Sequence, residues 1–215
     1  MEKILYVDLD GVLVNFIDGW MDHHSIESRK PVTKWNFGED YGLNRKDFYK
    51  SIISLPISFW SNLNPTPWAF ELIDRLTEGI GFFKCDKIMF LSHSVSEECR
   101  IGKQLWANKH FPKFGDSLIT VPDSKLKAKF ANENCTLIDD KPQNCEEFVK
   151  AGGSSYLFAR PWNRGMPCEK DSVIFFSFSE ALMGETVTWE AVLEPVKIRK
   201  QTSLIEAIIK GEIND

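Results

Sequence analysis

Two carboxylates two positions apart, Asp8 and Asp10, follow a short apolar run near the start of the chain, Ile4-Leu5-Tyr6-Val7. The apolar character of the run predicts a short buried β-strand. Side chains two apart on an extended segment point the same way, and open α/β sheets bind ligands at the carboxyl ends of their strands. Two ionised carboxylates at this spacing repel each other unless a cation or a proton lies between them. The pattern therefore favours a hard divalent ion, above all Mg²⁺.

A second apolar run, Thr136-Leu137-Ile138, also ends in carboxylates, the adjacent Asp139 and Asp140. A single Asp-x-Asp after a strand is most often a pair of solvated turn residues. Two strands that each bring acids to one edge of a sheet make a cation site the better interpretation. We expect Asp8, the backbone carbonyl of Asp10 and one acid of the second pair to supply the protein ligands.

The elements that must position these acids alternate along the chain. Apolar runs typical of strands recur, and segments with helical spacing lie between the later ones. The strands are expected at residues 4–7, 87–91, 117–121, 136–138 and 155–158, and the helices at 67–76, 97–110, 127–132 and 144–151. This alternation predicts an α/β fold, a doubly wound parallel sheet with helical crossovers.

The interval between the first two strands, residues 14–87, is far longer than an ordinary crossover needs. It follows the first acidic motif directly and is rich in aromatic residues. We interpret it as a small, mostly helical cap inserted over the site, with most of its aromatic side chains forming the core of the cap.

Taken together, the motifs resemble the haloacid dehalogenase (HAD) superfamily of phosphohydrolases. The resemblance rests on four motifs: Asp-Leu-Asp-Gly-Val-Leu at 8–13, Ser92 at the end of an apolar run, a lysine-bearing segment, and Leu-Ile-Asp-Asp at 137–140. The stretches at 8–16 and 59–69 resemble, more narrowly, the 5'(3')-deoxyribonucleotidases and their bacterial and phage relatives. The resemblance implies a Rossmann-like core at 1–14 and 77–184 and a cap at 15–76. Residues 185–215 would form a C-terminal extension.

The resemblance also implies roles for individual residues. Asp8 would be the nucleophile that forms an aspartyl-phosphate, and Asp10 the general acid and then the general base. Ser92 would hold a phosphate oxygen. Among the acids of the second pair, it favours Asp140 as the direct metal ligand and Asp139 as its close neighbour.

Two further positions carry alternatives. The family has a lysine that neutralises phosphate charge, and Lys127 is favoured over Lys129 and Lys125, because Lys-Ala-Lys-Phe-Ala before the second acidic motif resembles the bacterial and phage relatives. His93 stands where the deoxyribonucleotidases often have serine. Both a contact to the phosphate and no role in the site remain open for His93.

Substrate choice is expected to come from the cap. Nucleobases stack on aromatic rings, and Phe16 lies where the deoxyribonucleotidases have a phenylalanine in the base pocket. Phe59 and Trp60 are further candidates, although packing in the core is an equally good interpretation for each of the three. The segment 160–163, Arg-Pro-Trp-Asn, could reach the rim, and Trp68 replaces the glycine that is usual in the family.

Composition excludes several other classes. The 215 residues carry a formal charge of −5, whereas a protein that binds duplex nucleic acid would be strongly basic. The five cysteines lack metal-site spacing and indicate reduced thiols in the cytoplasm, and no apolar run approaches the ~20 residues that span a bilayer. An apolar stripe at 204–209 would pack on the domain or on a second copy of the chain.

These observations predict a Mg²⁺-dependent phosphomonoesterase that hydrolyses (deoxy)nucleoside monophosphates, with no membrane partner. One alternative is a HAD phosphatase acting on another phosphate ester, such as a sugar phosphate or a nucleic-acid end. The other is a catalytically silent binding protein that retains the fold.

Overall fold

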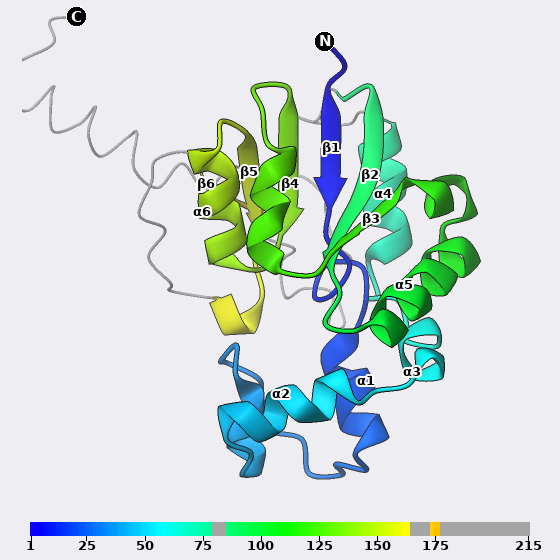
Figure 1. The fold of residues 1–215 in the computed structure, drawn as a ribbon, viewed down its shortest axis with the longest axis vertical. Helices are drawn as coiled ribbons and strands as arrows, with labels where there is room; N and C mark the ends of the chain where they lie inside the picture. Colours follow the sequence, from blue (N-terminus) through cyan, green and yellow to red (C-terminus); the bar gives the residue numbers. More distant parts are fainter. Residues whose placement is uncertain (79–84, 164–172, 177–215) are drawn as a thin grey trace, which may run out of the picture.

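The computed structural model of the chain describes residues 1–78, 85–163 and 173–176, and it is built around one parallel sheet (Figure 1). Within these residues six strands lie in the order β3-β2-β1-β4-β5-β6. Their bounds are β1 Ile4–Val7, β2 Lys87–His93, β3 Leu118–Val121, β4 Cys135–Asp139, β5 Ser154–Phe158 and β6 Val173–Phe176. All neighbouring pairs are parallel. The expected α/β class and parallel sheet are therefore confirmed, and β6 adds a strand that the sequence had not indicated.

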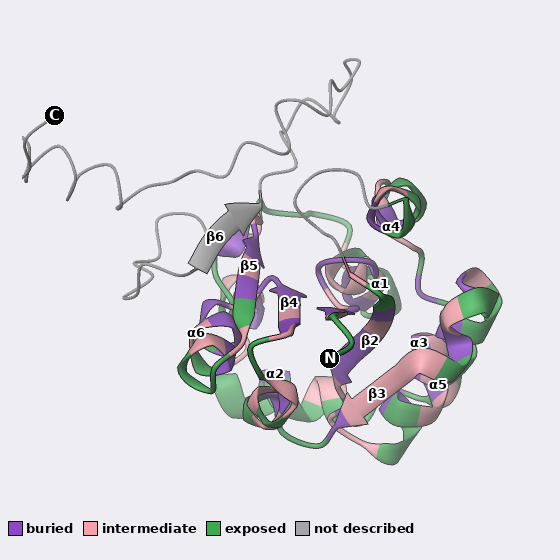
Figure 2. Ribbon diagram, turned by 90° about the horizontal axis from the view of Figure 1, so that it is seen from above, coloured by how far each residue is buried: buried purple, intermediate pink, exposed green. Residues whose placement is uncertain are grey.

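Helices cover both faces of this sheet. The helices α4 (Ala69–Thr77) and α5 (Glu97–His110) share a buried cluster with Leu5 and Val7 of β1. Tyr6, between those two residues, belongs to the opposite cluster, where α6 (Pro142–Lys150) packs beside the 3₁₀ helix η3 (Ser124–Phe130). This alternation follows from the two-residue period of a strand, and α4 and α6 lie on opposite sides in Figure 2.

Further helices lie beyond the carboxyl edge of the sheet (Figure 1). They are α1 (Phe16–His23), the 3₁₀ helix η1 (Phe37–Tyr41), α2 (Arg45–Ile53) and α3 (Ile57–Ser61). Trp20, Phe37 and Phe48 pack edge to face in their interior, with ring centroids 4.8–5.4 Å apart. Three such rings supply the apolar area that a small helical unit needs, as expected for a cap.

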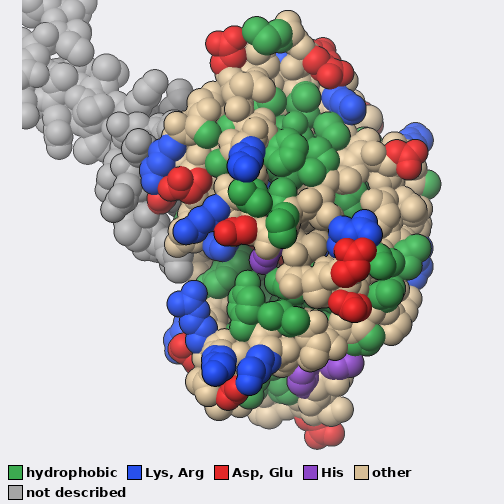
Figure 3. All heavy atoms as spheres, in the orientation of Figure 1, with side chains coloured by type: hydrophobic (Ala, Val, Ile, Leu, Met, Phe, Trp, Pro, Cys, Tyr) green, Lys and Arg blue, Asp and Glu red, His purple; other side chains and the backbone are tan. Residues whose placement is uncertain are grey.

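The cap is joined to the sheet domain at two places. Helix α3 packs on α5, where Gly102 makes the close approach possible, because a Cβ there would overlap the side chain of Trp60. On the other side, the exposed Trp35 lies over the ammonium of Lys141, 5.5 Å from Nζ to the ring centroid. Figure 3 shows hydrophobic side chains flanked by Lys and Arg side chains along this junction. The cap expected at residues 15–76 would include most of α4, which shares the buried cluster of β1, so we propose residues 15–63 as the cap.

The strand order fixes where a ligand should bind. From β1 the chain proceeds to β2 and β3 in one direction, and β4 then pairs with the free side of β1. The sheet therefore reverses its order between β1 and β4, and a crevice opens at the carboxyl ends of strands at such a switch point. The two acidic motifs follow these two strands.

Several expectations concern features away from the sheet. Cys85, Cys99 and Cys135 are free thiols, and Cys145 donates from its Sγ to the carbonyl of Asp139. Among the helices of the described segments, none is long and apolar enough to cross a membrane. The fifth cysteine, the extension at 185–215 and its apolar stripe lie outside the described residues.

Candidate active site

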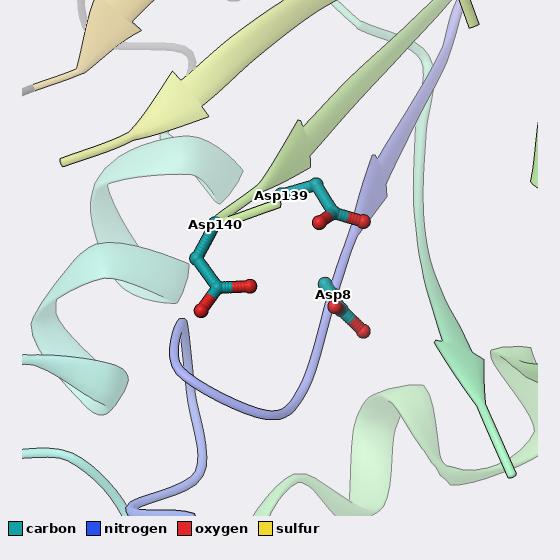
Figure 4. Close-up of side chains that lie close together, drawn as sticks. All are labelled: Asp8, Asp139 and Asp140. Atoms are coloured by element: carbon teal, nitrogen blue, oxygen red, sulfur yellow. The ribbon is translucent and has the colours of Figure 1, made fainter. Parts of the chain in front are cut away.

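Three carboxylates meet at the switch point of the sheet. Asp8 follows β1, Asp139 ends β4 and Asp140 comes next, and one oxygen from each lies within 4.8 Å of the others (Figure 4). All three are buried. Gly11 turns the chain between them with a φ of 79°, and a Cβ at this position would overlap the carboxylate of Asp140. The loop after β1 can therefore close over Asp140 only because residue 11 is glycine.

Lys127 contacts two of these three carboxylates. Its side chain is 1% exposed, and Nζ lies 2.9 Å from Asp8 Oδ2 and 2.6 Å from Asp139 Oδ2. The segment forms a 3₁₀ helix, in which residues three apart lie on the same side, so Ser124 and Lys127 are both buried. Lys125 and Lys129 are exposed. Of the three candidate lysines, the structure brings Lys127 to the acids.

The two acids of the second pair have different surroundings. Asp139 accepts hydrogen bonds at both oxygens, from Lys127 Nζ, the Lys141 amide (2.8 Å) and Asn144 Nδ2 (3.0 and 3.2 Å). Asp140 accepts one at Oδ2, from the indole N–H of Trp162 at 2.8 Å. Its Oδ1 receives none from the described residues. The free oxygen of the pair is therefore on Asp140.

Asn163 completes the support of Asp140 by donating to its backbone carbonyl (2.7 Å) and to that of Phe158 (2.8 Å). Two residues of the segment 160–163, which was expected at the rim, therefore contact Asp140, namely Trp162 and Asn163. Arg160 of the same segment stacks between the rings of Trp68 and Trp162, at 4.6 and 4.5 Å.

Burial and neighbouring charges shift the pKa of Asp8 downward and the pKa values of Asp139 and Asp140 upward. Burial disfavours the ionised form of Asp8, but attraction by Lys127 and Lys103, with hydrogen bonds from Lys127 and the Leu9 amide, leaves its pKa below the usual value. Burial, followed by repulsion from Asp139 and Asp8, holds the pKa of Asp140 well above its usual value. The pKa of Asp139 is raised mainly by burial, against the attraction of Lys127.

These shifts fit a site for a divalent cation. The pKa of Asp8 is lowered, so Asp8 is ionised, whereas burial and the charges of Asp139 and Asp8 disfavour a further negative charge on Asp140. A hard cation bound there would remove the repulsion, and oxygen donors are the ligands that Mg²⁺ prefers. The chemistry of the donors therefore suits Mg²⁺, and Asp8 and Asp140, with the expected carbonyl of Asp10, are the residues that could hold it.

A second buried lysine, Lys103 of α5, lies on the other side of the site. Its Nζ is 2.6 Å from Asp10 Oδ2, 3.0 Å from Ser92 Oγ and 2.5 Å from the His93 carbonyl. Burial lowers the affinity of this amine for its proton, but the charges of Asp10, Cys99 and Asp8 outweigh burial and raise its pKa. Lys103 is thus protonated and joins the two remaining motif residues, Asp10 and Ser92.

The sequence reasoning missed Lys103, although the pattern of α5 contained the signal. The buried positions of this helix are Cys99, Gly102, Lys103, Trp106 and Ala107, which follow the three- and four-residue spacing of a core-facing stripe. A lysine in the middle of an apolar stripe must find acidic or carbonyl partners at the end of a strand. A lysine on the buried face of a helix is therefore a candidate residue of an active site.

The remaining candidates have mixed surroundings. Trp60 is 2% exposed and lies between Phe16, stacked at 5.6 Å, and the ammonium of Lys103, 5.5 Å from its centroid. Phe16 and Phe59 are half-buried and pack edge to face at 6.2 Å. Of these three aromatic side chains, Phe16 and Phe59 are therefore partly accessible, whereas Trp60 is buried. The Pro122 carbonyl accepts a hydrogen bond of 3.2 Å from Nε2 of His93. The ring of His93 therefore contacts the loop that follows β3.

Comparison with protein families gives one match that spans most of the chain. The model of "5' nucleotidase, deoxy (Pyrimidine), cytosolic type C protein" matches residues 2–173. A comparison with curated proteins finds no match.

Among solved structures, a HAD family hydrolase from Deinococcus radiodurans R1 with bound phosphate and sodium is similar, with 14% identity and a TM-score of 0.49. The match covers 91% of this chain and 99% of that one. The HAD-hydrolase YfnB from Bacillus subtilis, bound to magnesium, has 14% identity and a TM-score of 0.47, with 77% and 89% covered. CbbY from Rhodobacter sphaeroides, in complex with phosphate, has 11% identity and a TM-score of 0.47, with 84% and 96% covered.

Proposed function

The chain belongs to the family of cytosolic type C 5' nucleotidases acting on deoxy substrates, and is a HAD-type phosphatase; we propose that it hydrolyses (deoxy)nucleoside monophosphates with the help of Mg²⁺. The observation that carries the proposal is the buried cluster of Asp8, Asp140 and Lys127 at the switch point of the sheet. An ionised carboxylate beside a protonated lysine and a cation site is what a phosphoryl-accepting nucleophile requires.

In the proposed first step, a carboxylate oxygen of Asp8 attacks the phosphorus, and the bond from phosphorus to the ester oxygen breaks. The leaving oxygen takes a proton from Asp10, so that nucleoside and an aspartyl-phosphate are formed. In the second step, water attacks the phosphorus while Asp10 takes one of its protons. The bond between Asp8 and phosphorus then breaks, which releases phosphate and restores both carboxyl groups.

The surrounding residues stabilise the charge on the transferring group. Lys127 contacts the nucleophile directly, and its ammonium can approach an equatorial phosphate oxygen without moving away from Asp8. Ser92 is buried at the end of β2, where its hydroxyl can donate to a second oxygen. A bound Mg²⁺ would supply Lewis-acid neutralisation of the phosphate charge.

Selection of a nucleotide is proposed to come from the cap. Phe16, Phe59 and Trp60 form one cluster of rings. Phe16 and Phe59 are half-buried, so they provide the part of this cluster that a ligand can contact. A nucleobase that stacks on such a ring gains about 1–3 kcal/mol, which corresponds to about 5- to 150-fold in affinity. This stacking would favour nucleotides over sugar phosphates.

The test is phosphate release from purine and pyrimidine nucleoside monophosphates, sugar phosphates and a 5'-phosphorylated oligonucleotide, each with and without Mg²⁺. The proposal predicts Mg²⁺-dependent preference for the monophosphates. Turnover of only the sugar phosphates or the oligonucleotide would refute the substrate assignment while retaining the chemistry. An absence of turnover with every substrate would favour a silent binding protein.

A further inference from the structure

The ammonium of Lys103 is fully engaged inside the active site. Its three N–H donors match the three acceptors around it, namely Asp10 Oδ2, Ser92 Oγ and the His93 carbonyl. The side chain is 3% exposed, and its ammonium lies 5.5 Å from the ring centroid of Trp60 of the cap. A lysine held by three acceptors and excluded from water keeps one orientation, so the groups that it contacts are also fixed.

The hydrogen bond to Asp10 distinguishes the two oxygens of that carboxyl group. Oδ2 is occupied by Lys103, whereas Oδ1 is buried and has no hydrogen-bond partner among the described residues. A buried oxygen without a hydrogen-bond partner destabilises the folded protein unless a ligand donates a hydrogen bond to it. Oδ1 is thus the oxygen available for exchange of a proton with the leaving group and with water.

Lys103 is also the donor in the hydrogen bond to Ser92. Because the ammonium of Lys103 can only donate, Ser92 Oγ accepts from it and keeps its own O–H free. That hydrogen can then be donated to a phosphate oxygen. If Lys103 is removed, Ser92 retains its hydroxyl, whereas Asp10 loses the only side-chain partner that it has among the described residues.

We propose that Lys103 is a positioning residue, which holds Asp10 with Oδ1 aimed at the ester oxygen of the substrate. The inference rests on the proposed function, because it takes Asp10 as the group that transfers the proton. The contribution of Lys103 then depends on the leaving group. An alkoxide, as in a nucleotide, needs protonation when the phosphorus–oxygen bond breaks, whereas nitrophenolate does not.

The experiment compares wild type and Lys103→Met on a nucleoside monophosphate and on 4-nitrophenyl phosphate. Turnover of the monophosphate should fall about 100-fold or more, the usual scale of general acid–base catalysis. Formation of the phosphoenzyme from the aryl ester should fall less than about 10-fold, and the second step should be slow. Rapid mixing should then show a burst of one nitrophenolate per active site. Lys109→Met, at an exposed position of the same helix, should match wild type on both substrates.

Equal losses on the two substrates without a burst, or wild-type turnover by Lys103→Met, would overturn the proposal. Lys103→Gln replaces Lys103→Met if the latter lacks the wild-type circular dichroism spectrum, and it must show the same dependence on the leaving group. If wild type hydrolyses another alkyl phosphate instead of nucleotides, the proposed substrate fails. The Lys103 comparison is then made with that alkyl ester.

Discussion

Asp140→Asn is expected to stabilise the metal-free protein while abolishing its activity. One oxygen of Asp140 lies within 4.8 Å of oxygens of both Asp8 and Asp139. At that separation, and at an effective dielectric constant of about 20, two like unit charges repel by about 3.5 kcal/mol. The nearby charge of Lys127 offsets part of this repulsion. The amide removes the charge and can still accept the hydrogen bond from Trp162, so a gain of about 2 kcal/mol is expected.

The sign of the pH dependence follows from the pKa of Asp140. Its folded-state pKa is raised above the unfolded value of about 3.9, so it destabilises the folded protein as pH rises toward and through the raised pKa. The difference between Asp140→Asn and wild type should therefore be small near pH 4 and largest above neutrality. Added Mg²⁺ should stabilise wild type and leave the variant unchanged, because the variant lacks a metal ligand.

Thermal unfolding, followed by calorimetry in chelator and then in excess Mg²⁺, measures this effect. For a chain of this size, 2 kcal/mol corresponds to a rise in Tm of about 4–8 °C. Asp116→Asn is the matched control, since Asp116 is exposed and far along the chain from the acidic motifs. A lower Tm for Asp140→Asn than for wild type in chelator above neutral pH would refute the repulsion between the three carboxylates.

Three further predictions concern individual side chains. Lys127→Met should lower kcat by about 10²–10³-fold, because it removes a positioned cation from the nucleophile, whereas Lys129→Met should have little effect; comparable losses would contradict the assignment. Trp162→Phe should weaken Mg²⁺ activation about 10-fold by removing the N–H that orients Asp140, and unchanged titration with Mg²⁺ would exclude this role. Phe16→Ala should raise KM for nucleotides about 10-fold more than KM for 4-nitrophenyl phosphate, and equal effects on both would argue against base stacking on Phe16.

The central sheet could be predicted from the sequence because buried parallel strands appear as short, almost continuous apolar runs. The acids at the ends of β1 and β4 could also be identified from the sequence, because each acidic pair directly follows an apolar run. The pairing of β1 with β4 brings these motifs together across about 130 residues, and the observed register confirms the parallel pairing. The pattern of two apolar runs ending in acids indicated a shared cation site, and the resemblance added the phosphoryl-transfer chemistry.

Other features depend on three-dimensional context. The three candidate lysines differ only in their orientation on η3, and its 3₁₀ geometry buries Lys127 together with Ser124. Lys103 could have been found as a charged residue on the buried stripe of α5, whereas its partners are 10 to 93 residues away in sequence. The burial of Trp60 arises from packing of α3 on α5 beside Gly102, a contact that no sequence pattern indicated.

The most direct test of the account is to find the phosphoryl group on Asp8. Enzyme and a nucleoside monophosphate would be mixed with Mg²⁺, quenched in acid within the first turnover, and digested for mass spectrometry. The account predicts one phosphoryl group on the peptide that contains Asp8, and none in Asp8→Asn or in chelator. Phosphate release at the wild-type rate by Asp8→Asn, or a phosphoryl group on a different residue, would contradict it.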